Sequence, residues 1–308
     1  GFLWEDMNKW KNPKNVAASG GIIVLLAFLL GVLTYIAFLT FIHNLVNRNT
    51  INIFAILLTV LIAGFIGFVD DILGWKTKGL PKKVRLLTLI LASVPLIVVN
   101  AGIKKMVLPF FGEFYFGIFY PLFLIPLGVV GVTSVYNFLA GFNGLEAGLG
   151  VLILSFLGYV SYISGNAWLA VISFCMVFSL FAFLIFNWCP AKVFGGNVLT
   201  YSIGSLIAAM AIVGNFEKIA FIVFIPFIIE MFLKIRGRLE KHSFGKPKED
   251  NSLELRYDKI YGLTHFSIWF LSKIKNKVYE KEVVLLIFLI ELIFIFIAYL
   301  SLIGYLPL

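Results

Sequence analysis

Long apolar runs separated by short polar segments make up most of the chain. A helix of about 20 apolar residues spans the roughly 30 Å hydrocarbon core of a bilayer. Nine runs are close to that length or longer, at residues 19–43, 51–69, 86–101, 118–136, 147–164, 167–187, 199–214, 217–235 and 282–306. A transmembrane β-barrel would instead show short segments of alternating polarity, so these runs predict helices. The expected fold is all-α, a polytopic transmembrane helix bundle with about nine spans.

The composition agrees with lipid as the main solvent of the chain. Hydrophobic residues make up 61% and charged residues 13% of the 308 residues, whereas soluble domains have roughly 45–50% apolar and 25% charged residues. The net charge is +9, but the basic residues lie between the apolar runs. That placement is typical of residues that set membrane topology. We therefore expect a membrane, and no nucleic acid, as a partner.

The basic residues are divided unevenly between the two ends of the expected spans. If 1–18 defines one side, four of the 25 Lys and Arg residues fall on the other side, which leaves 21 on the side of 1–18. The positive-inside rule makes the richer side cytoplasmic. We expect a single transmembrane domain over 1–308, in which residues 236–281 form a polar cytoplasmic loop insertion.

Two adjacent carboxylates, Asp70 and Asp71, end the second apolar run. A helix C-terminus is the negative end of the helix dipole, so two anions there need nearby cations. Basic residues follow directly, at Lys76, Lys78, Lys82, Lys83 and Arg85. The pattern fits a salt network at a helix end, and it equally fits a carboxylate pair that handles a metal or a proton beside a phosphate site.

Two further cytoplasmic loops are rich in glycine and amide side chains. Residues 137–148 contain Asn137 and Asn143 among three glycines, and residues 187–197 contain a Gly pair followed by Asn197. Glycine lets the backbone approach a ligand, and an Asn side chain can read a base edge or coordinate a cation. Ordinary turns have the same composition, so both interpretations stay open.

Ionisable residues also occur in the 236–281 loop and inside the runs. Lys241 and His242 belong to a basic loop that could simply set topology or contact anionic lipid. Glu230 precedes Lys234 by four residues, which favours a structural ion pair. Glu291 has no evident partner in the sequence and stays unassigned, although an ionisable group inside a span is a functional candidate.

The order of these segments and the residues in them resemble those of the polyprenyl-phosphate N-acetylhexosamine-1-phosphate transferases. The similarity is greatest to the eukaryotic and archaeal branch that attaches N-acetylglucosamine (GlcNAc) 1-phosphate to dolichyl phosphate. The segments that carry it are Glu5–Lys9, Ser19–Gly21, Asp70-Asp71, Asn137–Gly148, Asn187–Asn197 and Glu254–Tyr257. The family has ten transmembrane helices, the first of which precedes the segment similar to Glu5–Lys9, so we expect that helix to be absent from this sequence.

The resemblance implies roles for particular residues. Asp70 and Asp71 correspond to the paired catalytic aspartates, and Asn137 and Asn197 to the positions associated with Mg²⁺, for which Mn²⁺ is an alternative. The implied substrate-binding residues are Gly141, Asn143 and Phe194 for uridine, Lys83 and Arg85 for phosphate, and Lys241 and His242 for the diphosphate. Asn197 departs from the family, which usually has Asp there, so the implied metal site carries one negative charge fewer.

The implied reaction transfers GlcNAc-1-phosphate from UDP-GlcNAc to a polyprenyl (dolichyl) phosphate and releases UMP, the first membrane step of N-glycan lipid-linked oligosaccharide synthesis. The implied location is the plasma membrane of an archaeon or the endoplasmic reticulum of a eukaryote, with the active-site loops cytoplasmic. A homodimer is compatible with the sequence. Two other functions stay open: a membrane transporter or flippase, and a catalytically weakened homologue that binds the nucleotide sugar.

Overall fold

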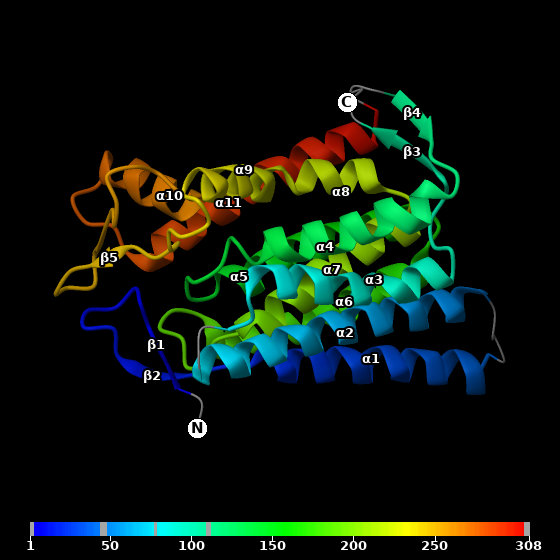
Figure 1. Cartoon of the computed structure of the whole chain (residues 1–308), viewed down its shortest axis with the longest axis horizontal. Helices are drawn as coiled ribbons and strands as arrows, with labels where there is room; N and C mark the ends of the chain where they lie inside the picture. The colour runs from blue at the N-terminus through cyan, green and yellow to red at the C-terminus, as the bar shows by residue number, and fades with distance from the viewer. Residues whose placement is uncertain (1–2, 44–47, 77–78, 109–111, 305–308) are drawn as a thin grey trace.

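The computed structural model describes residues 3–43, 48–76, 79–108 and 112–304. Its architecture confirms the all-α prediction, because helices form the body of the molecule and strands form only small hairpins among the described residues (Figure 1). The helical elements in chain order are α1 (Gly21–Phe41), α2 (Arg48–Lys76), α3 (Lys82–Val98), the π-helical turn η1 (Tyr120–Leu124), α4 (Ile125–Tyr136), α5 (Leu145–Ile163), α6 (Ala167–Asn187), α7 (Gly196–Gly214), α8 (Glu217–Val223), α9 (Ile225–Arg236), α10 (Leu263–Ser272) and α11 (Glu280–Leu302).

Three antiparallel hairpins lie at the two ends of the helix bundle. They pair β1 (Leu3–Glu5) with β2 (Lys14–Ala17), β3 (Lys105–Leu108) with β4 (Gly112–Tyr115), and β5 (Lys246–Pro247) with β6 (Leu253–Glu254). In Figure 1 the first and third hairpins lie with α10 at one end of the bundle, and the second hairpin lies at the other end. We call the end that carries β1, β2, β5 and α10 the polar end.

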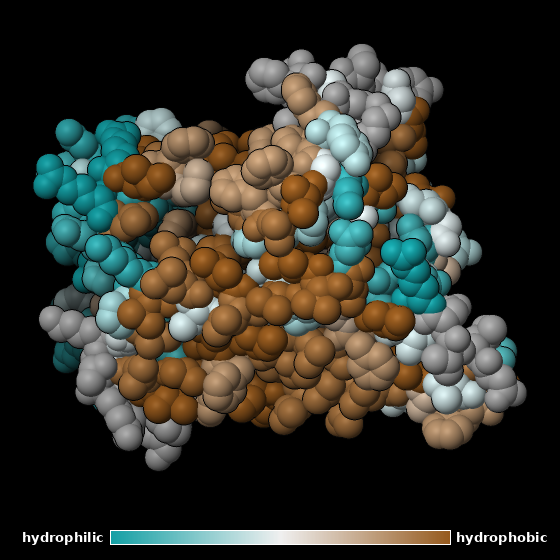
Figure 2. All heavy atoms as spheres, turned by 45° about the vertical axis from the view of Figure 1, so that its right-hand side comes forward, coloured by the Kyte–Doolittle hydropathy of each residue, from teal (hydrophilic) through white to brown (hydrophobic). Residues whose placement is uncertain are grey.

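Six helices of the described chain are long and apolar enough to cross a membrane: α1, α2, α5, α6, α7 and α11. The other three expected runs fall on shorter elements, namely α3, η1 with α4, and α8 with α9. Figure 2 shows a broad area of hydrophobic side chains across the middle of the visible face, with hydrophilic side chains gathered at the polar end and in smaller patches toward the opposite end. The protein is therefore an integral membrane protein.

The expected span at 217–235 is not one continuous helix. It divides at Phe224 into α8 and α9, and Pro226 lies in the first turn of α9. Proline has no backbone N–H and its ring clashes with the preceding turn, so it suits a helix start and not a helix interior. The Phe224 ring stacks on Phe227 at 4.6 Å between centroids, which packs the junction.

Helix α7 lies at the centre of the bundle, where every residue from Val198 to Ile212 is buried. It packs mainly against α2 and α4 and, to a lesser extent, against α1 and α5. The absence of a side chain at Gly67 of α2 permits a close approach of the two helices, since a Cβ there would lie 2.4 Å from the Asn197 carbonyl oxygen. This contact brings the end of α2, with its two aspartates, against the start of α7.

The two buried glutamates of the spans have different surroundings. Glu230 Oε1 lies 3.6 Å from Lys234 Nζ, which confirms the expected pair. Glu291 is fully buried, and neither of its carboxylate oxygens has a hydrogen-bond partner among the described residues. The structure gives no account of Glu291.

Candidate active site

A cavity of about 680 Å³ opens at the polar end of the bundle. Its walls come from the N-terminal segment, the end of α2, the loops before α5 and α7, and the loop after α9. The side chains and backbone that line it include Trp4, Asp6, Met7, Ser19, Asp71, Asn137, Gly141, Phe142, Glu146, Phe194, Gly196, Asn197, His242 and Phe244. Segments from both halves of the sequence therefore meet around one space, which we call the larger cavity.

Asp71 lies in the wall of the larger cavity and is held by the start of α7. Its Oδ1 accepts a hydrogen bond from the Asn197 backbone N–H at 2.8 Å, and its Oδ2 accepts one from Val198 N–H at 3.3 Å. Ser19 Oγ donates to the same Oδ2 at 3.3 Å. A helix N-terminus favours an anion, so α7 compensates the unfavourable position of Asp71 in α2.

Asp70 lies deeper, with 1% of its surface exposed, and it is not part of the larger cavity's lining. Arg85 Nη2 lies 2.8 Å from its Oδ2, Asn197 Nδ2 donates to the same oxygen at 2.9 Å, and the Leu80 backbone N–H donates to Oδ1 at 2.7 Å. The expected compensating cation is therefore Arg85. Lys83 is exposed and lines neither this cavity nor the second one, so its phosphate-binding role stays a prediction.

The two predicted metal ligands both line the larger cavity. Asn137 caps the end of α4, where its Oδ1 accepts a hydrogen bond from Thr200 Oγ1 at 2.9 Å. The Asn197 amide nitrogen donates to Asp70, which leaves the amide oxygen available. Together with Asp71 these side chains offer oxygen atoms that could ligate a metal. No group of three or more His, Cys, Asp or Glu suited to a metal occurs within the described ranges. Oxygen donors in small number fit Mg²⁺, which keeps water and phosphate as its other ligands.

A second cavity of about 320 Å³ adjoins the first and shares Asn137, Ala140, His242 and Phe244 with it. We call it the smaller cavity. Its lining is basic, with Lys82, Arg85, Lys234 and Lys241, and also includes the apolar Leu86, Phe138 and Leu239. The structure thus brings Arg85 together with Lys241 and His242, which lie about 160 residues later in the sequence.

The protonation of His242 follows from its surroundings. Burial lowers the pKa of its imidazole below the usual 6.5, and the positive charges of Arg256 and Lys234 lower it further. The side chain is therefore neutral at pH 7. The fixed positive charges of the smaller cavity come from its lysines and Arg85.

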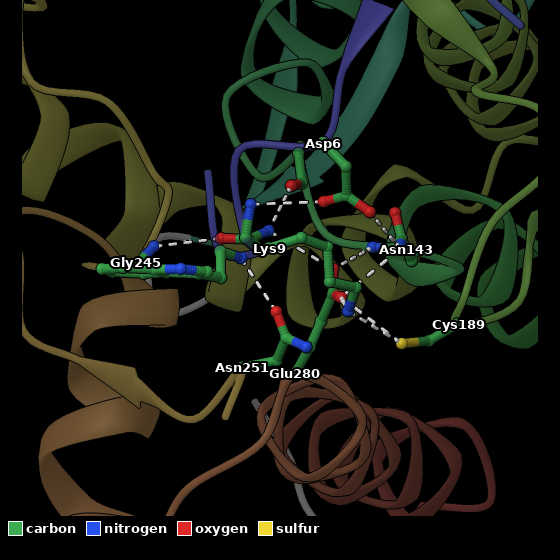
Figure 3. A network of polar contacts seen from close by, with 10 residues as sticks. Asp6, Lys9, Asn143, Cys189, Gly245, Asn251 and Glu280 are labelled. Atoms are coloured by element: carbon green, nitrogen blue, oxygen red, sulfur yellow. Dashed lines mark hydrogen bonds and ion pairs between the residues drawn. The ribbon is translucent and has the colours of Figure 1, made fainter. Parts of the chain in front are cut away.

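The three predicted uridine-contacting residues lie in different positions. Gly141 and Phe194 line the larger cavity. Asn143 is 3% exposed and does not line the cavity, and its amide nitrogen donates to Asp6 Oδ2 at 3.1 Å and to Glu280 Oε2 at 3.3 Å (Figure 3). A direct contact of Asn143 with uridine stays a prediction.

Several polar residues of this region were not predicted from the sequence. Asp6 and Ser19 lie in segments that carry the family resemblance, so the resemblance could have identified them as site residues. Glu146 lines the larger cavity and accepts a hydrogen bond from Gly141 N–H at 2.6 Å. Nothing in the sequence distinguishes Glu280 as a residue of this region, because it is one of several charged residues at the end of a loop.

Two proteins of known family are similar to this chain over almost its whole length. A Saccharolobus solfataricus protein is 37% identical over 300 residues, which cover 96% of this chain and 87% of that protein. A Sulfolobus acidocaldarius protein is 35% identical over 301 residues, which cover 97% and 87%. Both are provisionally named UDP-N-acetylglucosamine–dolichyl-phosphate N-acetylglucosaminephosphotransferase.

A bacterial relative is more distant. The phospho-N-acetylmuramoyl-pentapeptide-transferase of Streptococcus pneumoniae is 29% identical over 231 residues, which cover 74% of this chain and 68% of that protein. The sequence pattern of glycosyl transferase family 4 matches residues 53–215, a range that contains both aspartates, both glycine-rich loops and the start of α7. The chain belongs to glycosyl transferase family 4.

Proposed function

We propose that the protein transfers GlcNAc-1-phosphate from UDP-GlcNAc to a polyprenyl phosphate such as dolichyl phosphate and releases UMP. The observation that carries this proposal is the pair of adjoining cavities, one lined by oxygen donors and the other by basic residues. A transferase with two substrates needs such neighbouring spaces. The names of the two archaeal relatives favour these substrates over a muramoyl pentapeptide.

In this proposal the larger cavity holds the nucleotide sugar. Its volume of about 680 Å³ is within the range of roughly 300–1,000 Å³ that is usual for small-molecule sites. Gly141 and Phe194 would contact the uridine, and the diphosphate would lie toward Asp71. Asn137 and Asn197, with Asp71, would hold Mg²⁺ or Mn²⁺. When bound, such a cation would neutralise the diphosphate charge.

The smaller cavity would hold the phosphate of the lipid acceptor. Lys82 and Lys241 supply positive charge there, and Arg85 and Lys234 add donors although they also pair with Asp70 and Glu230. Leu86 and Leu239 line the same cavity and are 46% and 39% exposed, so apolar surface continues outward from it. An isoprenoid chain could follow that surface into the bilayer while its phosphate stays at the basic residues.

The chemistry joins the two cavities. An oxygen of the lipid phosphate attacks the β-phosphorus of UDP-GlcNAc, a new P–O bond forms, and the bond from that phosphorus to the bridging oxygen breaks to release UMP. A phosphate monoester has a second pKa near 6, so the acceptor is largely dianionic at neutral pH and needs little help from a base. We assign Arg85 and the lysines to charge neutralisation and Asp71 to orientation of the reacting groups.

The orientation of the protein follows from the same assignment. We propose that the polar end faces the cytoplasm, because most of the basic loops lie there and the positive-inside rule places such loops inside. The nucleotide sugar would then reach the larger cavity from the cytoplasm.

The test is UMP release by the purified protein in detergent with UDP-GlcNAc and dolichyl phosphate. We expect release that requires both substrates and Mg²⁺. Release without dolichyl phosphate would indicate hydrolysis and contradict transfer. Binding of UDP without any release would support the weakened homologue, which the uncharged Asn197 favours. Neither binding nor release would leave transport as the better proposal.

A further inference from the structure

A buried carboxylate lies behind the larger cavity and has no part in the chemistry proposed above. Glu280 is the first residue of α11, has 2% of its surface exposed, and is not in the cavity lining. In Figure 3 its side chain points into a cluster of donors from the N-terminal segment and the loops of the polar end. The last membrane helix thus contributes a charged group to the region around the candidate site.

The donors to Glu280 come from three segments that are far apart in sequence. Lys9 Nζ lies 2.5 Å from Oε2 and forms an ion pair with it. The Asn143 backbone N–H donates to Oε1 at 2.8 Å, and the Cys189 thiol lies 3.3 Å from Oε2. The start of α11 adds a favourable helix dipole. Glu280 is therefore a buried anion whose partners are all donors.

The same cluster holds the wall of the larger cavity from behind. Asn8 Nδ2 donates to Glu280 Oε1 at 3.3 Å and to the Gly141 carbonyl oxygen at 2.9 Å. Asn8 Oδ1 accepts a hydrogen bond from Gly245 N–H at 3.1 Å, next to Phe244. Gly141 and Phe244 line the cavity, so three wall segments are fixed relative to one another through Asn8 and Glu280.

Asp71 depends on a different set of contacts. Its carboxylate is held by the backbone at the start of α7 and by Ser19. None of the hydrogen bonds to Glu280 among the described residues involves α2 or α7. A change at Glu280 should therefore affect the wall at Gly141 and leave the aspartate end of the cavity in place.

We propose that Glu280 is a positioning residue that fixes the part of the cavity wall that binds the nucleoside. The inference rests on the proposed function, in which uridine contacts Gly141. Glu280 touches neither substrate in this account. It acts through Asn8, Lys9 and Asn143, and a carboxylate is required because every partner is a donor.

The test compares two ligands that differ by the nucleoside. Binding of UDP and of inorganic pyrophosphate to the full protein in Mg²⁺ is measured by calorimetry for the wild type and Glu280→Gln. Gln presents an amide N–H₂ to a set of donors, so we expect UDP binding to weaken on the order of tenfold. Pyrophosphate binding should change by less than about twofold, because its contacts lie at the aspartate end.

The matched control is Glu282→Gln in the same helical turn. Glu282 pairs with Lys275 at 2.5 Å on the exposed side of the helix, so we expect no change in either affinity. In the transfer assay Glu280→Gln should raise KM for UDP-GlcNAc about tenfold while kcat changes less than about threefold. If Glu280→Gln does not fold, Lys9→Met removes the ion pair at a site that is 18% exposed and should show the same selective loss.

The outcomes separate the two proposals. If Glu280→Gln weakens the binding of UDP and pyrophosphate equally, or does not weaken the binding of UDP, the proposed role of Glu280 is wrong. The proposed function would still stand in that case, provided that the wild type releases UMP. A wild type that releases no UMP would overturn the proposed function whatever the ratio of affinities. A kcat loss with unchanged KM would also contradict a role in nucleoside positioning.

Discussion

Gly196, the first residue of α7, offers a direct test of how Asp71 is positioned. Its φ is +72°, in the left-handed region, and a Cβ added there would lie 2.2 Å from Asp71 Oδ2. Real Cβ atoms essentially never approach a neighbour closer than 3.0 Å. Gly196→Ala must therefore push the carboxylate away by about 0.8 Å, the shortfall between the two distances, or shift the start of α7.

The expected effect on turnover is large. Misplacement of a catalytic group by roughly 1 Å lowers a rate by about 10²-fold, which corresponds to about 2.7 kcal/mol of barrier. The left-handed backbone adds a separate destabilisation of about 1–2 kcal/mol for any residue with a Cβ. Activity and stability should thus both fall, for two different reasons.

Gly165 provides the matched control, because it separates the two effects. It has φ +80°, and a Cβ there would meet nothing within 4 Å. Gly165→Ala should lower the melting temperature through the backbone effect alone and leave kcat unchanged. Initial rates of UMP release and thermal unfolding in detergent measure both quantities. Near-normal kcat in Gly196→Ala, with the expected loss of stability, would refute the assignment of Asp71 to the reacting groups.

Three further predictions concern the metal, the departure at Asn197 and the pH dependence of stability. UDP at 100 times its Kd should stabilise the protein by about 2.7 kcal/mol in Mg²⁺ and by less in EDTA, as measured by thermal unfolding; equal protection would remove the metal from the nucleotide site. Asn197→Asp should raise the apparent Mg²⁺ affinity about tenfold, and an unchanged Mg²⁺ titration of turnover would show that Asn197 is not a ligand. Burial, aided by the Lys234 charge, lowers the pKa of His265 from 6.5 to about 4. The pKa of His265 is therefore lower in the folded than in the unfolded protein. The contribution of its neutral imidazole to the free energy of unfolding is complete above pH 6.5 and falls by about 1.4 kcal/mol per pH unit as the pH drops toward 4. His265→Phe should therefore lose less stability than the wild type between pH 7 and pH 5, and parallel curves would contradict a buried neutral imidazole.

The apolar runs predicted the helices well because lipid forces every backbone polar group to bond within its own segment. All nine runs lie on helical elements. The break at Phe224 was not predicted, since Pro226 lies inside an unbroken apolar run and proline is tolerated in membrane helices. Hydrophobicity gives the length of a run and carries no information on whether it holds one helix or two.

The candidate site was predictable where charge pointed to a local partner. Two aspartates at the end of a helix required a cation, and Arg85 supplies it to Asp70 at 2.8 Å. The role of the α7 start in binding Asp71 is a long-range contact, 126 residues away, that no local pattern reveals. The same is true of Glu280, which meets Asn143 across 137 residues.

The ion pair between Lys9 and Glu280 joins positions 271 residues apart, and this has a consequence for biogenesis. Ribosomes add about 5–20 residues per second, so roughly 14–54 s pass between the synthesis of the two residues. During that time the earlier helices can enter the bilayer, but Lys9 and the Asn143 loop lack the carboxylate of Glu280. A nascent chain should therefore bind nucleotide weakly until its last helix is inserted, which delays activity until the whole bundle has formed.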